Sequence, residues 1–126
     1  MLRPERQRIL VADDERLIAD TLAMILNRNG YESVPVYGGR QAVEKARRWC
    51  PDLFLSDVSM PELNGLQAAM EISAMFPKCR VLLFSGEPSS SILVRETSAR
   101  GHEFEFLQKP ISPLDLLSRI RHRRAA

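Results

Sequence analysis

Five polar or charged side chains follow directly, or within a residue or two, after short apolar segments of the chain. They are Asp13, Asp14, Asp57, Ser85 and Lys109. The apolar segments run over Ile9–Ala12, Leu53–Leu55, Val81–Phe84 and Phe104–Leu107. If these segments are parallel strands, the polar groups meet at one edge of one sheet, which is where open α/β sheets bind ligands. Three carboxylates, a hydroxyl and an ammonium at one edge suit a divalent cation and a phosphoryl group.

The residue types indicate phosphoryl chemistry. Three carboxylates in a small space repel one another unless a positive group lies between them. Mg²⁺ fits best, because it takes one or two carboxylates, keeps several waters and bridges to phosphate oxygens. Lys109 adds an ammonium, Ser85 a hydroxyl, and Gly86 leaves the backbone open to an incoming group. Asp57 is the predicted nucleophile, because carboxylates form acyl phosphates.

Alternating strands and helices are expected to position these groups. A further strand is predicted at Glu32–Tyr37, and its Pro35 favours an edge position because proline cannot donate to a sheet ladder. Helices are predicted at Arg16–Asn29, Arg40–Trp49, Leu66–Met75, about Ser90–Ala99, and after Ser112. Ser112 is the expected cap of the last helix, with Pro113 at its first position.

The helical spacing also predicts which side chains face the core. The inward positions are Leu17, Ile18, Thr21, Leu22, Ile25 and Leu26 in the first helix, Leu66, Ala69, Met70 and Ser73 in the third, and Leu114, Leu117 and Ile120 in the last. Five strands alternating with five helices predict a parallel sheet between two layers of helices.

Composition excludes several classes of protein. A length of 126 residues predicts a single domain, 1–126, and we expect flexible ends at 1–7 and 124–126. The net charge of +2 is too small to indicate nucleic-acid binding. No apolar run approaches the roughly 20 residues that span a bilayer. Cys50 and Cys79 indicate neither a disulfide framework nor a zinc site, so we expect reduced thiols in a cytoplasmic protein without a membrane partner.

The whole set of motifs resembles the receiver domain of two-component response regulators. The matching residues are the pair Asp13–Asp14, the segment Asp57-Val58-Ser59-Met60-Pro61 with Gly65, then Ser85 and Lys109-Pro110. The resemblance extends from Ile9 to the last helix. It implies a flavodoxin-like, doubly wound sheet of five parallel strands in the order 2-1-3-4-5, with five helices on its two faces.

The resemblance also implies a role for each residue of the site. Asp57 would accept a phosphoryl group from a sensor histidine kinase or a histidine phosphotransfer protein. Asp14, Asp57 and the backbone carbonyl of Ser59 would bind Mg²⁺, with Asp13 acting through water. Ser85, Gly86 and Lys109 would contact the phosphate, and the Lys109–Pro110 bond is expected to be cis. Such a domain assists its own phosphorylation but has no separate substrate to turn over, so we do not expect an enzyme.

Further implied roles concern switching and output. Ser85 and Phe106 would form the switch, while Ser59 and Glu87 would tune the lifetime of the acyl phosphate. The fourth helix, fifth strand and fifth helix would meet an effector or a second copy of the chain. The charged residues on these elements form either interfacial ion pairs or a solvated face; they are Arg95, Glu96, Glu105, Arg119 and Arg121.

Three other classes of function share the fold or the aspartate chemistry. An aspartyl-phosphate hydrolase usually has a second aspartate two residues after its nucleophile, where this chain has Ser59. A flavodoxin-like electron carrier needs a Ser/Thr/Gly-rich phosphate loop, and Asp13-Asp14-Glu15 would repel a flavin phosphate. A receiver-shaped module that is never phosphorylated stays open. So do the cognate kinase, the output, the oligomeric state and whether the domain belongs to a longer protein.

Overall fold

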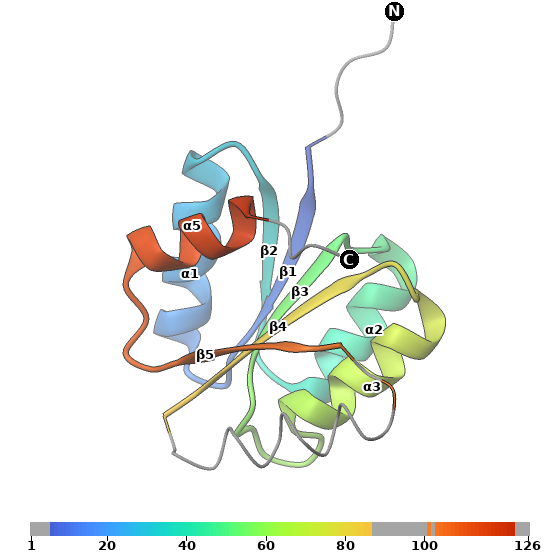
Figure 1. The fold of residues 1–126 in the computed structure, drawn as a ribbon. Helices are drawn as coiled ribbons and strands as arrows, with labels where there is room; N and C mark the ends of the chain where they lie inside the picture. Colours follow the sequence, from blue (N-terminus) through green and yellow to red (C-terminus); the bar gives the residue numbers. More distant parts are fainter. Residues whose placement is uncertain (1–5, 87–100, 102, 123–126) are drawn as a thin grey trace, which may run out of the picture.

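Five strands alternate with helices along the chain (Figure 1). The computed structural model describes residues 6–86, 101 and 103–122. The strands are β1 (Arg8–Ala12), β2 (Glu32–Val36), β3 (Leu53–Asp57), β4 (Arg80–Ser85) and β5 (Glu105–Gln108). The described helices are α1 (Arg16–Arg28), α2 (Gly39–Trp49), α3 (Gly65–Met75) and α5 (Pro113–Arg121). The helix predicted at about 90–99 and most of the two predicted flexible ends lie outside the described residues.

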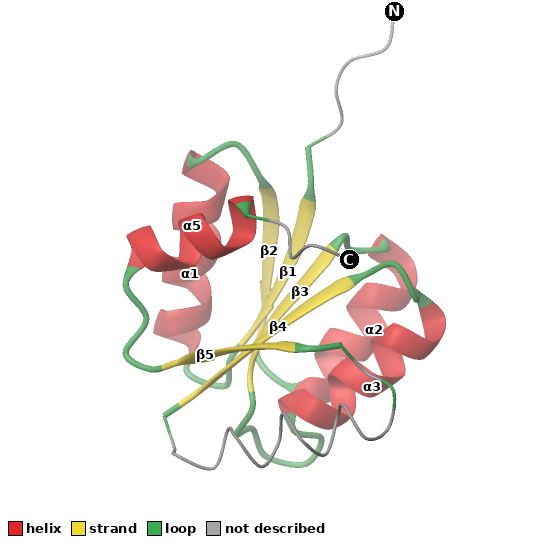
Figure 2. Cartoon of the chain, viewed as in Figure 1, coloured by secondary structure: helices red, strands yellow, loops and turns green. Residues whose placement is uncertain are grey.

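The strands form one parallel sheet in the order β2-β1-β3-β4-β5, as the resemblance implied (Figure 2). Helices α1 and α5 cover one face, and α2 and α3 cover the other (Figure 1). β2 is an edge strand, which confirms the position predicted from Pro35. No described helix is long and apolar enough to cross a membrane.

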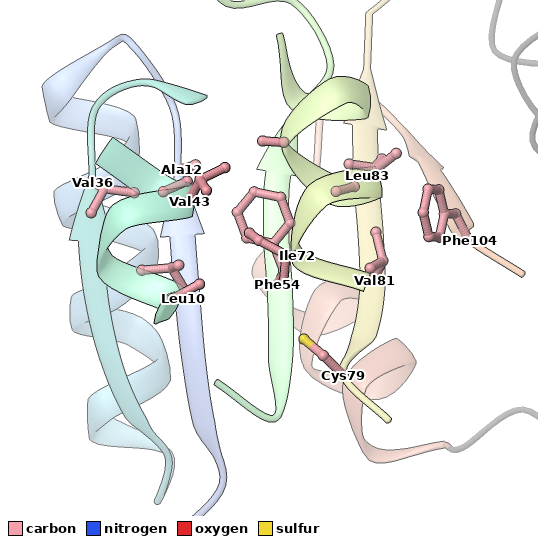
Figure 3. Close-up of a cluster of buried hydrophobic side chains, with 14 of the residues drawn as sticks. Leu10, Ala12, Val36, Val43, Phe54, Ile72, Cys79, Val81, Leu83 and Phe104 are labelled. Carbon is pink, nitrogen blue, oxygen red and sulfur yellow. The ribbon is translucent and has the colours of Figure 1, made fainter. Parts of the chain in front are cut away.

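The core has two layers because side chains alternate across the sheet. Leu10, Phe54 and Leu83 face α2 and α3, in the layer that Figure 3 shows. Val11, Leu55 and Phe84 are their neighbours along the strands and pack on the opposite layer against α1 and α5. Strands that are buried on both faces consist of nearly continuous apolar residues, so these strands could be predicted from the sequence.

Local sequence signals explain where the helices begin and end. Gly30 follows α1 with φ of 95°, a conformation that glycine adopts without strain. The side chain of Asn64 accepts a hydrogen bond from the backbone N–H of Gln67, and the Gln67 side chain accepts one from the Asn64 N–H, so α3 begins with a capping box. Ser112 caps α5 as predicted, with its side chain accepting from the Asp115 N–H.

Some of the predicted inward positions are wrong. Leu17 is 79% exposed and Leu114 is 78% exposed, because each lies in the first turn of its helix. In α3 the predicted face is largely confirmed, because Ala69 is buried and Leu66 and Met70 pack half-buried against the core. The prediction missed Ala68 and Ile72, which are fully buried.

Candidate functional site

The carboxyl ends of the four adjacent strands β1, β3, β4 and β5 bring the predicted polar groups together. Asp13 follows β1 directly, and Asp57 and Ser85 are the last residues of β3 and β4, so both strands extend beyond their predicted ends. Lys109 follows β5, and its backbone N–H donates to the Ser85 carbonyl at 2.9 Å. The strand register therefore fixes the positions of these residues at one edge of the sheet.

Three carboxylates form the centre of the site. Asp13, Asp14 and Asp57 each offer an oxygen, and these oxygens all lie within 4.8 Å of one another. Asp13 and Asp57 are buried, whereas Asp14 is exposed. The cluster therefore opens to solvent on the side of Asp14.

Asp13 has unsatisfied bonding capacity. Its Oδ1 accepts a hydrogen bond from the Glu15 N–H at 2.9 Å. Its Oδ2 is the only buried side-chain nitrogen or oxygen, among the residues that the structure describes, without a hydrogen-bond partner. Burial raises the pKa of Asp13, and the nearby carboxylates of Asp57 and Asp14 raise it further, against lowering by the Glu15 N–H and Lys109. Clustered carboxylate oxygens with a deficit of positive charge fit a hard cation such as Mg²⁺.

Lys109 supplies positive charge to the cluster. Its Nζ lies 3.0 Å from Asp57 Oδ2 and 5.2 Å from the centre of the Phe84 ring. Asp57 Oδ1 accepts from the backbone N–H of Ser59 at 3.1 Å. The Lys109–Pro110 peptide bond is cis, which confirms the expectation. Both oxygens of Asp57 are thus held in a fixed orientation.

The loop after Asp57 is held by contacts that the sequence does not predict. The Ser56 hydroxyl donates to the Asp57 carbonyl at 2.9 Å. A Cβ on Gly65 would lie 2.0 Å from the same carbonyl oxygen, so only glycine fits there. Gly65 belongs to the motif that follows Asp57, whereas the only sequence signal at Ser56 is a hydroxyl within an apolar strand. These contacts fix the backbone that carries Asp57.

The other predicted site residues differ in burial. Ser85 is buried, Gly86 is exposed beside it, and the Ser59 side chain is exposed. Phe106 is half-buried against the core layer of α2 and α3. Glu87 lies outside the described residues.

Glu105 does not belong to a solvated interface. It is buried, with 8% of its surface exposed, and pairs with Arg80, so its predicted availability for partner ion pairs is wrong. Of the other charged residues considered for that surface, Arg119 is half-buried and donates to the Phe106 carbonyl, and Arg121 is exposed. Arg95 and Glu96 lie outside the described residues.

Comparison with known proteins identifies the family. The model of the response regulator receiver domain matches residues 9–121. The chemotaxis protein CheY of Thermotoga maritima is 31% identical over 108 residues, covering 85% of this chain and 88% of that protein. The DNA-binding response regulator MtrA of Mycobacterium tuberculosis is 30% identical over 118 residues, which are 94% of this chain and 50% of MtrA. The chain thus spans about half the length of MtrA.

Solved structures agree with this assignment. The chemotaxis response regulator CheY4 of Vibrio cholerae is 28% identical with a TM-score of 0.80, covering 93% of this chain and 98% of that one. A CheY-like receiver domain protein of Methanospirillum hungatei is 26% identical with a TM-score of 0.84, and the match covers 93% of this chain and 92% of that one. The acidic cluster, the sheet order and these matches agree, and the chain belongs to the response regulator receiver domain family.

Proposed function

We propose that this domain is a phosphorylation switch in which Asp57 accepts a phosphoryl group with the help of Mg²⁺. The observation that carries the proposal is the cluster of Asp13, Asp14 and Asp57, whose oxygens lie within 4.8 Å of one another beside Lys109. A fold needs no such concentration of like charge for its stability. Membership of the receiver family supports the same assignment.

The carboxylates have separate roles in this proposal. Asp14, Asp57 and the Ser59 carbonyl would hold Mg²⁺ directly, with Asp13 acting through water, and the bound ion would supply positive charge to the carboxylates and the phosphoryl oxygens. The Ser59 N–H on Oδ1 and Lys109 on Oδ2 orient the Asp57 carboxylate before the donor arrives. The fixed orientation lowers the cost of reaching the reactive geometry.

The transfer itself requires little covalent chemistry from the protein. A carboxylate oxygen of Asp57 forms a bond to phosphorus while the phosphorus–nitrogen bond of a donor phosphohistidine breaks. The electron pair of that bond returns to the imidazole nitrogen, so no further reactant is needed. Lys109 and the Ser85 hydroxyl then contact the phosphoryl oxygens, and exposed Gly86 leaves room for them.

Switching and lifetime complete the proposal. Ser85 would move toward the phosphoryl group, and half-buried Phe106 would turn into the space that Ser85 leaves. Ser59 and Glu87 would control how easily water reaches the acyl phosphate. The domain would act as a signalling phosphoacceptor and not as an enzyme with a separate substrate.

The donor would be a cytoplasmic histidine kinase or histidine phosphotransfer protein. Leu17 and Leu114 lie in the first turns of α1 and α5, which begin at the edge of the sheet that carries the site. A docking donor would cover these exposed leucines and gain apolar burial. An effector or a second copy would contact β5, α5 and the segment between β4 and β5.

We propose that residues 1–126 form one receiver domain that binds neither nucleic acid nor membrane directly. The MtrA relatives are DNA-binding regulators, but this chain spans about half of their length. Its net charge of +2 gives no reason to assign DNA binding to the receiver domain.

The test is phosphorylation by acetyl phosphate with Mg²⁺, followed by intact mass. We expect the wild-type protein to gain the mass of one phosphoryl group, and Asp57→Asn, the isosteric control, to gain none. Removal of Mg²⁺ with a chelator should prevent the gain. Steady release of phosphate from added phosphoesters would favour a hydrolase, and the absence of any adduct would favour a module that is never phosphorylated.

A further inference from the structure

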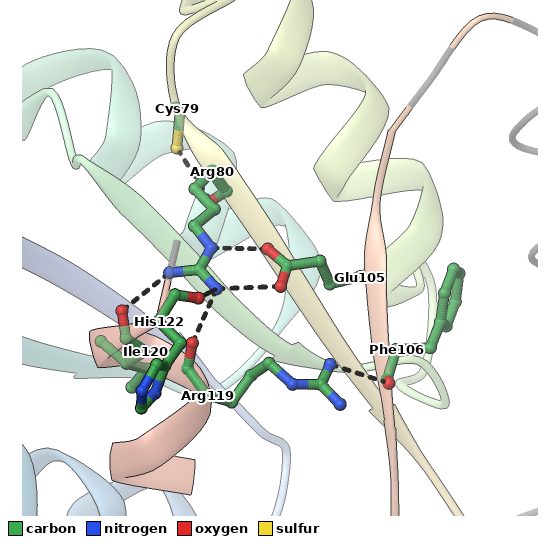
Figure 4. A network of polar contacts seen from close by, with 7 residues as sticks. All are labelled: Cys79, Arg80, Glu105, Phe106, Arg119, Ile120 and His122. Atoms are coloured by element: carbon green, nitrogen blue, oxygen red, sulfur yellow. Dashed lines mark hydrogen bonds and ion pairs between the residues drawn. The ribbon is translucent and has the colours of Figure 1, made fainter. Parts of the chain in front are cut away.

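Arg80 lies at the end of the sheet opposite the acceptor site, as the first residue of β4. Its Nε and Nη2 donate to the two carboxylate oxygens of Glu105 on β5, at 2.5 and 2.8 Å. The same guanidinium donates to three backbone carbonyls at the end of α5, those of Arg119 and Ile120 at 2.8 Å and of His122 at 3.2 Å. Figure 4 shows Arg80 between Glu105 and the end of α5. One side chain therefore joins β4, β5 and the last turn of α5.

The chemistry of this cluster favours a rigid connection. The side chains of Arg80 and Glu105 are only 18% and 8% exposed, so water competes weakly for their hydrogen bonds. The last carbonyls of a helix lack partners within the helix and carry the negative end of its dipole, which a guanidinium satisfies. Only arginine presents a planar fork that can bind a carboxylate through two bonds while donating elsewhere.

The last turn of α5 also contacts the strand at Phe106. Arg119 Nη1 donates to the Phe106 carbonyl at 3.5 Å, next to Glu105 in the strand (Figure 4). The same strand runs on to Lys109, whose ammonium is bonded to Asp57. A continuous set of directional contacts thus leads from Asp57 through β5 to the end of α5.

The remaining contacts of α5 with the sheet are apolar. Leu116, Leu117 and Ile120 pack into the core layer that α5 shares with α1. Apolar packing is not directional and tolerates small sliding motions, whereas a bidentate ion pair is lost when its geometry changes. The hydrogen bonds of Arg80, together with that of Arg119 to the Phe106 carbonyl, are therefore the directional contacts that make the end of α5 follow β5.

We propose that Arg80 is a coupling residue that makes the last turn of α5 respond when the acceptor site changes state. The inference rests on the proposed phosphorylation of Asp57 and identifies the route by which that event reaches the end of α5. Arg80 is a positioning residue in this scheme, since it acts through Glu105 and the α5 carbonyls without touching the phosphoryl group.

The test compares amide hydrogen exchange with and without beryllofluoride and Mg²⁺, the stable mimic of the acyl phosphate. The exchange rate is followed in two regions. The backbone around Ser59 and Lys109 reports on the site, and residues 118–122 report on the end of α5. Arg80→Lys keeps the charge and loses the fork. The double variant Arg80→Met/Glu105→Leu replaces the ion pair with apolar packing, so that folding survives without the coupling.

Arg8→Lys is the matched control. Arg8 starts β1, pairs with Glu32 on the neighbouring strand at 3.4 Å and donates to the Trp49 carbonyl at the end of α2 at 2.8 Å. Its layout resembles that of Arg80, but the side chains of this pair are 44% and 49% exposed. Its substitution removes an arginine from the same edge of the sheet without affecting α5.

In the wild-type protein and in Arg8→Lys, we expect the mimic to change exchange rates severalfold both at the site and at residues 118–122. In both Arg80 variants the site should respond within about twofold of wild type, while the response at residues 118–122 falls below twofold. If Arg80 only stabilises the fold, its substitution should raise exchange at residues 118–122 equally with and without the mimic. The ratio of the two exchange rates would then equal that of wild type, which would overturn the coupling. A wild-type protein that responds at the site and not in α5 would overturn the coupling alone; no response at the site would overturn the proposed function as well.

Discussion

At the carboxyl edge of the sheet, the carboxylates of Asp13, Asp14 and Asp57 cluster together, and the Lys109 ammonium pairs with Asp57. At the amino edge, Arg80 and Glu105 form a buried ion pair in which the donors and acceptors satisfy one another. Asp13 Oδ2 has no partner at the first edge, whereas Glu105 uses both of its oxygens at the second. The first cluster is electrostatically incomplete and suited to binding an added cation, and the second is complete and suited to holding elements together.

The largest expected effect comes from breaking the complete cluster. Arg80→Met leaves the buried Glu105 carboxylate without its partner, so we expect the free energy of unfolding to fall by about 3–5 kcal/mol. The double variant Arg80→Met/Glu105→Leu should recover most of that loss, because a well-packed apolar pair can replace an ion pair. Urea denaturation of both variants measures the difference. A single variant within about 1 kcal/mol of wild type would show that the pair is not tightly coupled.

Substitution in the incomplete carboxylate cluster is expected to raise the free energy of unfolding instead of lowering it. Asp13→Asn removes a buried charge that lacks a full set of partners, so we expect the metal-free protein to gain about 1–2 kcal/mol of stability at pH 7. Because the pKa of Asp13 is raised in the folded state, the folded protein takes up this proton more readily than the unfolded chain. The contribution of Asp13 to stability is therefore lost as the pH rises from about 3.8 through the raised pKa.

Denaturation at several pH values checks the sign. The advantage of Asp13→Asn over wild type should shrink as the pH falls through the raised pKa of Asp13 and the wild-type carboxyl becomes protonated. An advantage that grows on acidification would contradict the electrostatic account of this edge.

Removal of the ammonium sharpens the comparison further. Lys109 Nζ lies 3.0 Å from Asp57 Oδ2 and repels any cation bound to the same carboxylates. Lys109→Met should therefore bind Mg²⁺ about tenfold more tightly, which corresponds to ~1.4 kcal/mol. Calorimetric titration of wild type and variant measures this ratio, and weaker binding by the variant would be the contrary result.

The smallest effect is expected at the exposed pair on the amino edge. Arg8→Ala removes an ion pair with Glu32 whose side chains are about half exposed, so the loss in unfolding free energy should stay near 1 kcal/mol or less. The contact of Arg8 with the Trp49 ring, at 5.5 Å, is included in that loss. A cost close to that of Arg80→Met would mean that burial does not distinguish the two pairs.

The sequence was sufficient to predict the parallel sheet and the meeting of Asp13, Asp14, Asp57 and Lys109 at its carboxyl edge. Strands buried on both faces produce apolar runs such as Val81–Phe84, and the polar residues after them must meet because parallel strands share one carboxyl edge. The edge position of β2 followed from Pro35.

The complete cluster was not predicted, because its partners are far apart in the chain. Arg80 and Glu105 are separated by 25 positions, and each in isolation has the character of a solvated charge. Helical spacing alone predicts Leu17 and Leu114 in the core, although both are exposed, because the spacing carries no information on whether the first turn of a helix extends beyond the sheet. Burial at helix ends depends on tertiary placement, and periodicity does not encode it.

The most direct test of the incomplete edge is calorimetric titration of the metal-free protein with Mg²⁺ at neutral pH. We predict saturable binding at a single site that weakens at least tenfold in Asp14→Ala and in Asp57→Asn, and that is unchanged in Arg80→Lys. Absence of saturable binding by the wild-type protein would contradict the account. So would binding of Mg²⁺ by the two aspartate variants as tight as that of the wild-type protein.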